Sequence, residues 1–240
     1  MPRKRNKKTA IKRAAEYCEK GDYHIHLDSS WPYLPVYLEK MTYVKKLLNQ
    51  YGKNKKIIDL GCGEGVLVKE FNKKSFDIIG LDLNYQSKFV KRGNILNTKY
   101  PNNSFDIILC LDVIEHLSFH EQNIAIQEMS RILKSGGKLI ITIPNLAHLA
   151  SRFSFFFLGK LLRTSKIDRH IGDRPISEHL KLLKFNFTIL KRKGFFPTFP
   201  LISALTYFKP SKAIFLHKIY NKLLGYPNWC LLNILICEKK

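Results

Sequence analysis

The sequence has few acidic residues, few cysteines and no long apolar run, and each scarcity excludes a class of protein. Its five cysteines are scattered without a Cys-x-x-Cys pair. This argues against a disulfide framework or a thiolate zinc site, and it predicts a reducing, cytoplasmic compartment. No apolar run approaches the ~18–20 residues that a membrane-spanning helix needs, so we expect no transmembrane segment.

Basic side chains outnumber acidic ones by 41 to 19, for a net charge of +22. The excess is uneven: the net charge is +7 over residues 1–54, +2 over residues 55–150 and +13 over residues 151–240. Such flanks would attract an anionic substrate, an RNA or an acidic lipid surface. A Lys-rich composition that only keeps the protein in solution is the alternative interpretation.

The charge distribution also suggests how the chain is organised. Seven of the first thirteen residues are Lys or Arg, without the apolar stretch of a secretory signal, so we interpret residues 1–34 as a basic tail and lead-in. The length suits one elaborated domain over residues 35–240. Within it we expect a cofactor half at 55–145, followed by substrate-side helices and closing strands at 146–240.

Short apolar strand patterns alternate with helical patterns along the cofactor half. Strands are expected at 55–60, 75–82, 88–91, 105–110 and 138–143. Helices are expected at 35–51, at 66–71 and from the capping box of Ser118 and Glu121 to Gly136-Gly137. Later residues suggest a helix at 153–162 and strands at 195–199 and 229–237. This alternation predicts an α/β fold, a Rossmann-like doubly wound sheet with helices on both faces.

Three glycines, Gly61, Gly63 and Gly65, follow the first predicted strand and precede a helix. A nucleotide-like ligand binds at this position in α/β sheets. Dinucleotide sites instead need Gly-x-Gly-x-x-Gly spacing around a pyrophosphate. Here Asp59 and Glu64 flank the turn, and two carboxylates would repel a pyrophosphate but tolerate an ammonium and a sulfonium.

Asp82 ends the second predicted strand, about 20 residues after the glycine loop, where a carboxylate can accept hydrogen bonds from ribose hydroxyls. The alternative is a plain glycine-rich turn and an ordinary strand-terminal aspartate. The two features, in register with five alternating strands, favour a ligand site.

Residues 55–145 resemble a class I S-adenosylmethionine-dependent methyltransferase of the small-molecule type. The resemblance rests on Asp59-Leu60-Gly61-Cys62-Gly63-Glu64-Gly65, Leu81-Asp82, Gly93-Asn94-Ile95, Phe105 to Leu117, and Leu133 to Asn145. It implies about seven mostly parallel strands with the last one antiparallel. It also implies that S-adenosylmethionine lies over the ends of the first, second and fourth strands. The cofactor-binding residues that it implies are Asp59, Gly61, Cys62, Gly63, Gly65, Asp82, Leu83, Asn94, Ile95, Leu111 and Asp112.

Asn94 departs from the family, which often has aspartate beside the adenine. The carbonyl of the amide could still accept a hydrogen bond from the adenine amino group. We therefore expect adenine binding to survive in weaker form.

Methyl transfer from a sulfonium depends mostly on alignment, and a base is needed only if the acceptor must lose a proton. His116 and Glu115 follow the fourth predicted strand and are our candidates for catalysis, with His116 as general base because its ordinary pKa lies near neutral. The alternative is that His116 caps the following helix or bonds to backbone.

We expect no metal, although one alternative stays open. Asp112, Glu115 and His116, with a distant His148, His170 or His179, could form an oxygen and nitrogen site. That set resembles the ligands of small-RNA 3′-terminal 2′-O-methyltransferases, with Asp112 in place of the usual longer carboxylate.

The leading hypothesis is O-methylation of a hydrophobic or anionic small molecule, such as a lipid-linked sugar or a quinone. Residues 154–163 join aromatics to basic ends and suggest an interfacial helix, a lid or a core helix. The segment from His179 to Phe195 resembles enzymes that act on glycans, lipid-linked compounds or quinones. Peripheral membrane contact is therefore considered. The alternatives are an RNA methyltransferase, metal-assisted or not, and a non-catalytic or membrane-associated binding protein that retains the fold.

Overall fold

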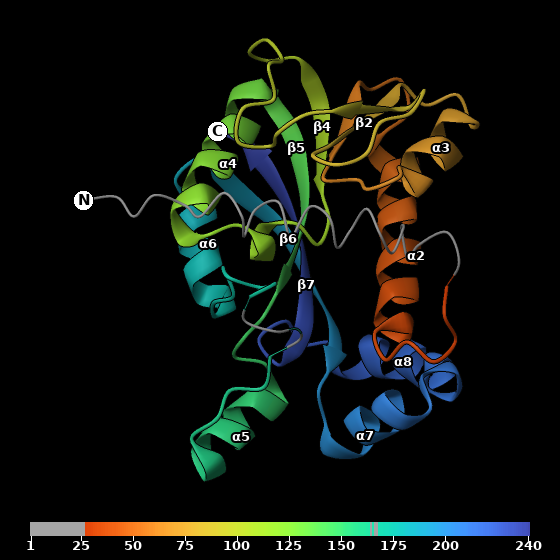
Figure 1. Ribbon diagram of the computed structural model, residues 1–240, viewed down its shortest axis with the longest axis vertical. Helices are drawn as coiled ribbons and strands as arrows, with labels where there is room; N and C mark the ends of the chain where they lie inside the picture. Colours follow the sequence, from red (N-terminus) through yellow and green to blue (C-terminus); the bar gives the residue numbers. More distant parts are fainter. Residues whose placement is uncertain (1–26, 164, 166–167) are drawn as a thin grey trace.

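The computed structural model describes residues 27–163, 165 and 168–240, so most of the predicted basic tail lies outside the described residues. Seven strands form one sheet in the order β3-β2-β1-β4-β5-β7-β6 (Figure 1). Their bounds are β1 Ile57–Leu60, β2 Ile78–Asp82, β3 Val90–Arg92, β4 Phe105–Cys110, β5 Leu133–Pro144, β6 Phe187–Pro197 and β7 Cys230–Lys239. The last strand, β7, pairs antiparallel with both β5 and β6, and the pairs among β1 to β5 are parallel. The expected sheet is confirmed.

Helices cover both faces of this sheet, as predicted. They are α2 Leu34–Tyr51, α3 Val66–Asn72, α4 Phe119–Ile132, α5 Leu149–Leu158, α6 Ile176–Lys184, α7 Pro200–Phe208 and α8 Pro210–Leu224, with a 3-10 turn η1 at Ile114–His116. On one face Ile58 and Ile108 pack with Met129 of α4. On the other face Ile57 packs with Phe71 of α3. Alternate residues of a strand thus pack into two separate apolar layers, one on each face of the sheet. The sheet therefore lies at the centre of the core.

Several boundaries differ from those expected. The helix that starts at the capping box of Ser118 and Glu121 ends at Ile132, four residues before the glycine pair. Leu133 turns to an extended conformation and is buried in β5, so tertiary burial overrides the glycine stop signal. The helix expected at 153–162 instead begins at Leu149, because the side chain of His148 caps it, and ends before Gly159 at a φ of 63°. The patterns did not indicate α6 and α7.

One edge of the sheet collects the segments that matter for function. The carboxyl ends of parallel strands meet at the same edge, so the loops after β1, β2 and β4 lie together. Because β5 and β6 both run antiparallel to β7, they end at that edge too, and they lead into α5 and α7. Figure 1 shows α5 and α7 projecting beyond the sheet at the bottom of the molecule. Within the described part of the chain, no helix is both long and apolar enough to cross a membrane.

Candidate functional site

The loop between β1 and α3 depends on its three glycines. Gly61, Gly63 and Gly65 have φ values of 72°, 56° and 74°. This left-handed region is unfavourable for residues with a Cβ. A Cβ at Gly61 would also overlap the side chain of Val113, and one at Gly65 would overlap that of Val90. The loop therefore has a tight path that only glycine can follow, at the carboxyl edge of the sheet.

Asp82 joins this loop to the end of β2. Its Oδ2 accepts a hydrogen bond from the backbone N–H of Gly63 at 2.8 Å. Its Oδ1 accepts from the N–H groups of Asn84 at 2.8 Å and Tyr85 at 3.2 Å. A carboxylate offers about four acceptor sites, and these three bonds leave one on Oδ2 for a ligand hydroxyl. The structure thus brings together the two features that predicted a ligand site.

Asp59 is buried below the loop, and its pKa is raised to about 7. Burial is the main cause, the charge of Asp82 adds to it, and Lys40 partly opposes both. A cationic group placed nearby would favour the ionised carboxylate. The site is therefore able to exchange a proton for a positively charged ligand.

The other predicted cofactor residues lie around the same edge. Leu83 follows Asp82 and is 58% exposed, which offers an apolar surface beside a carboxylate. The side-chain carbonyl of Asn94 accepts a hydrogen bond from the N–H of Leu96 at 2.9 Å, so the atom expected to meet adenine also holds a local turn. Cys62, Ile95 and Leu111 are half-buried, each packed against one of the two apolar layers.

Asp112 follows β4 with a positive φ of 54° and is held from three directions. Its N–H donates to Thr142 Oγ1 at 2.6 Å, and the Thr142 hydroxyl donates to its Oδ1 at 2.8 Å. Its Oδ2 pairs with the ammonium of Lys40. Sequence reasoning missed both partners. A signal existed for Lys40, which lies four residues from Val36 and from Val44 on the buried face of α2.

Glu115 and His116 lie on η1, beside Asp112. Glu115 is only 3% exposed, and its Oε2 has no hydrogen-bond partner among the described residues. Burial and the charge of Asp112 raise its pKa well above the usual range. His116 Nδ1 lies 3.0 Å from the carbonyl oxygen of Arg169, a backbone contact of the kind that the alternative interpretation of this residue describes. Burial and His170 lower the pKa of His116 to about 4, so the imidazole is neutral at neutral pH.

The candidate metal ligands separate into two groups. Glu115, His116 and His170 each place one possible ligand atom within 4.8 Å of the others. Asp112 is instead bonded to Lys40 and Thr142.

The two remaining histidines lie elsewhere. His148 caps α5, and its ring nitrogens meet Thr198 Oγ1 at 2.8 Å and the Leu162 carbonyl at 3.1 Å. His179 is buried in α6, and neither ring nitrogen has a hydrogen-bond partner in the described ranges. Neither belongs to the cluster of Glu115, His116 and His170.

The residues of the loop fit S-adenosylmethionine in their chemistry. The carboxylates of Asp82 and Asp59 suit hydroxyls and a cation, and the exposed Leu83 suits a flat base. The tight glycine turn allows the backbone to approach a ligand closely.

Comparison with known proteins agrees with this assessment. A family model described as a methyltransferase domain matches residues 33–183, which is more than half of the chain. An uncharacterized protein of Methanocaldococcus jannaschii is 38% identical over 111 residues, which cover 42% of this chain and 47% of that protein. A ubiquinone biosynthesis O-methyltransferase of Aliivibrio fischeri is 26% identical over 157 residues, 58% of this chain and 65% of that protein. The chain thus spans between about half and two thirds of the length of these relatives.

Solved structures share the fold at low sequence identity. A protein from Pyrococcus horikoshii has a TM-score of 0.56 and 16% identity, covering 85% of this chain and 91% of that one. A SAM dependent methyltransferase from Archaeoglobus fulgidus has a TM-score of 0.54 and 18% identity, covering 83% and 94%. The fold shared with these structures therefore covers most of the chain and not only the glycine loop.

Proposed function

The chain belongs to the methyltransferase-domain family and uses S-adenosylmethionine, and from this premise we propose that it methylates an oxygen of a hydrophobic small molecule. A quinone-like compound or a lipid-linked sugar fits this description. The observation that carries the acceptor class is the apolar surface left exposed on α5 and on α7 and α8, at the edge of the sheet where the site lies.

We assign the donor side of the site to the loop from Gly61 to Gly65 with Asp59 and Asp82. When bound, the cofactor supplies a methyl group on a sulfonium: the S–CH₃ bond breaks as the O–CH₃ bond forms, and S-adenosylhomocysteine leaves with the bonding electron pair. Asp82 would accept a hydrogen bond from a ribose hydroxyl at its remaining acceptor site, because three backbone N–H groups already position its two oxygens. Asp59 would face the cationic part of the ligand.

On the acceptor side we assign His116 and Glu115 to the reaction. An acceptor hydroxyl must lose its proton, and the ring of His116 is neutral and available as a base, although a weak one because its pKa is lowered to about 4. Glu115 is buried, and a carboxylate oxygen of it lies within 4.8 Å of a ring nitrogen of His116. Asp112, which follows β4 directly before η1, is held in place by Lys40 and Thr142.

Helix α5 supports a hydrophobic acceptor. Ser151 is its only buried residue, although most of the helix is apolar. Phe156 and Phe157 are 81% and 71% exposed, and Phe155 and Leu158 are exposed beside them. An apolar helix without a partner in the domain is typical of a surface that contacts lipid or a large apolar ligand.

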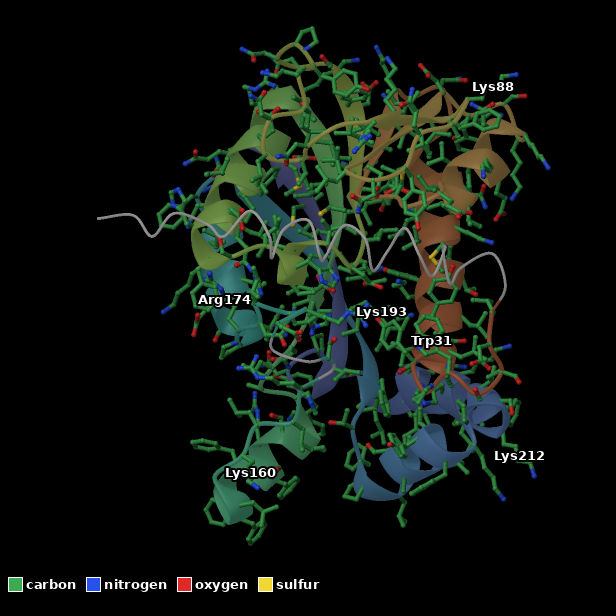
Figure 2. All side chains as sticks on the ribbon, in the orientation of Figure 1. Trp31, Lys88, Lys160, Arg174, Lys193 and Lys212 are labelled. Carbon is green, nitrogen blue, oxygen red and sulfur yellow. The ribbon has the colours of Figure 1, made fainter. Side chains whose placement is uncertain are left out.

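Helices α7 and α8 add a second apolar surface at the same edge of the sheet. Leu201, Phe208, Phe215 and Leu223 are all largely exposed. Lys160 follows α5 and Lys212 lies on α8, and Figure 2 shows both at this end of the molecule. Aromatic side chains together with lysines suit the interface of an anionic bilayer, where a lipid-soluble acceptor would be found. We propose peripheral contact of this end with an acidic membrane.

The relative from Aliivibrio fischeri supports transfer to oxygen, since its name is ubiquinone biosynthesis O-methyltransferase. At 26% identity it supports the type of reaction more than the particular acceptor.

The reaction is tested by incubating the protein with isotopically labelled methyl donor and lipid, glycan and RNA extracts. We expect label in the organic-soluble fraction, in products whose methyl group is ether-linked. Label confined to the RNA fraction would overturn the proposed acceptor, and so would label on nitrogen only.

Membrane contact is tested by co-sedimentation with vesicles. We expect binding to vesicles that contain acidic phospholipid, and loss of most of that binding when Phe155, Phe156 and Phe157 are replaced by serine. Phe185→Ser is the matched control, because Phe185 is 80% exposed but precedes β6 at the opposite edge of the sheet. Equal loss of binding in both variants would contradict the proposed orientation.

A further inference from the structure

Three potential metal ligands converge from two separate loops. Glu115 and His116 come from η1, directly after β4, and His170 comes from the segment before α6. One ligand atom of each lies within 4.8 Å of the other two. The rings of His116 and His170 meet edge to face, with centroids 4.8 Å apart. Residues 54 positions apart in the chain are therefore gathered on the acceptor side of the site.

Both imidazoles have an acceptor at Nδ1. His116 Nδ1 lies 3.0 Å from the carbonyl oxygen of Arg169. His170 Nδ1 lies 3.3 Å from Oδ1 of Asp173, which is itself buried. An acceptor at Nδ1 selects the tautomer with its proton there and its lone pair on Nε2. Histidines that ligate metals are oriented in this way, by a carbonyl or a carboxylate on the other nitrogen.

Glu115 supplies the third group. Its Oε2 is buried and has no hydrogen-bond partner among the described residues. A buried polar atom without a partner is costly, and native structures usually satisfy it with a protein group, a water or an ion. A cation between Glu115 and the two imidazoles would satisfy this oxygen.

We propose that Glu115, His116 and His170 bind a divalent first-row transition metal ion, with Asp173 and the Arg169 carbonyl as positioning groups. Two imidazoles and one carboxylate suit Zn²⁺, Fe²⁺, Co²⁺ or Mn²⁺ rather than Ca²⁺ or Mg²⁺, which prefer all-oxygen sites. Three protein ligands leave a coordination position for another oxygen.

A metal ion at this site would bind the acceptor through its hydroxyl oxygen. This step of the inference rests on the proposed function. An acceptor hydroxyl bound at the open position would lose its proton to solvent more readily, because a metal ion lowers the pKa of a coordinated hydroxyl. The oxygen would then be held as an alkoxide or phenoxide for methylation. His116 would act as a ligand in this arrangement, and general-base catalysis by its ring would not be required.

The test measures metal binding directly, without an acceptor. Protein dialysed against a chelator is titrated with Zn²⁺, Co²⁺ and Mn²⁺ by calorimetry, and the Co²⁺ complex is followed by its visible absorption. We expect one ion per chain, and at least a tenfold loss of affinity in His170→Ala and Glu115→Gln. Asp173→Asn should weaken binding about 10-fold while leaving every ligand in place. His120→Ala is the control, because His120 is exposed on α4 and outside the cluster.

Each variant is also titrated with S-adenosylhomocysteine and checked by circular dichroism. Retained cofactor binding with lost metal binding supports the site and excludes misfolding. Absence of stoichiometric binding of any of the three ions at millimolar concentration would overturn the proposal, as would equal metal affinity in His170→Ala and His120→Ala. Because no acceptor is present, a wrong acceptor class would leave these results unchanged.

Discussion

The two halves of the domain differ in where their apolar side chains lie. In residues 55–145 the apolar residues fill two layers around the sheet, and the site is held by partly buried hydrogen bonds such as those of Asp82 and Asp112. Of the 21 large apolar side chains that are exposed among the described residues, 18 lie beyond residue 150. The second half also carries a net charge of +13, against +2 for residues 55–150. The first half therefore buries most of its apolar surface around the sheet, whereas the second half leaves much of its apolar surface exposed together with an excess of positive charge.

The largest loss of stability among the variants that test this comparison of the two halves is expected at Gly61. Gly61→Ala should lower the free energy of unfolding by about 3 kcal/mol, because it combines a left-handed backbone with overlap against Val113. Gly136→Ala is the matched control, since Gly136 has a φ of 68° but open space around it. It should cost about 1 kcal/mol. Chemical denaturation measures both, and equal losses would show that packing in the glycine loop is not restrictive.

A similar loss is expected in cofactor affinity at Asp82. Asp82→Ala should weaken S-adenosylhomocysteine binding about 100-fold, the effect of losing about 3 kcal/mol of charge-assisted hydrogen bonding together with the support for the Gly63 N–H. Asp77→Ala is the control, because Asp77 is exposed just before β2. Calorimetry compares the two variants. Unchanged affinity in Asp82→Ala would place the cofactor elsewhere.

A smaller change in cofactor affinity is expected from the protonation of Asp59 as the pH is lowered. Its pKa of about 7 means that the free protein carries a proton there below neutral pH. A cationic ligand favours the carboxylate, so binding should release a proton, and affinity should fall by up to about tenfold per pH unit below pH 7. Calorimetry in buffers of different ionisation enthalpy measures the proton count. Asp59→Asn should remove this dependence, and a wild-type affinity that is flat between pH 5.5 and about pH 7 would contradict it.

In the absence of ligand, the raised pKa of Asp59 makes the free energy of unfolding depend on pH. Between its ordinary pKa near 4 and its folded pKa of about 7, the folded state holds a proton that the unfolded state lacks. The contribution of Asp59 to the free energy of unfolding is therefore greatest at low pH and falls as pH rises to about 7. Comparison of wild type with Asp59→Asn isolates this slope from the titration of the histidines.

The features that could be predicted from the sequence are those encoded locally. The glycine loop, Asp82 and the capping box of Ser118 depend on residues a few positions apart or on a strand end, and the structure places them as expected. The spacing of Lys40 from Val36 and Val44 indicates that it lies on the buried face of its helix, but its pairing with Asp112 could not be predicted, because the two residues are 72 positions apart.

Most of the features that could not be predicted from the sequence depend on contacts between segments far apart in the chain. His170 meets Glu115 and His116 only through the path of residues 168–175, which has no periodic pattern. The start of β5 at Leu133 likewise depends on its burial in the sheet, against the local signal of two glycines. For α5 the helix was predicted, but its apolar composition fitted a core helix as well as an exposed one. Only the tertiary arrangement distinguishes these two cases.

The smallest effect on stability is expected on α5, where the contrast between the halves is sharpest. Phe156→Ala should change the free energy of unfolding by less than about 0.5 kcal/mol, because the ring is 81% exposed and little apolar area is lost. Binding to acidic vesicles should nevertheless decrease in the same variant. Chemical denaturation and co-sedimentation of one preparation measure both quantities. A loss of about 3 kcal/mol or more, as for a buried phenylalanine, would mean that α5 packs against the domain. The apolar surface would then be part of the core, and the hydrophobic acceptor would lose its main support.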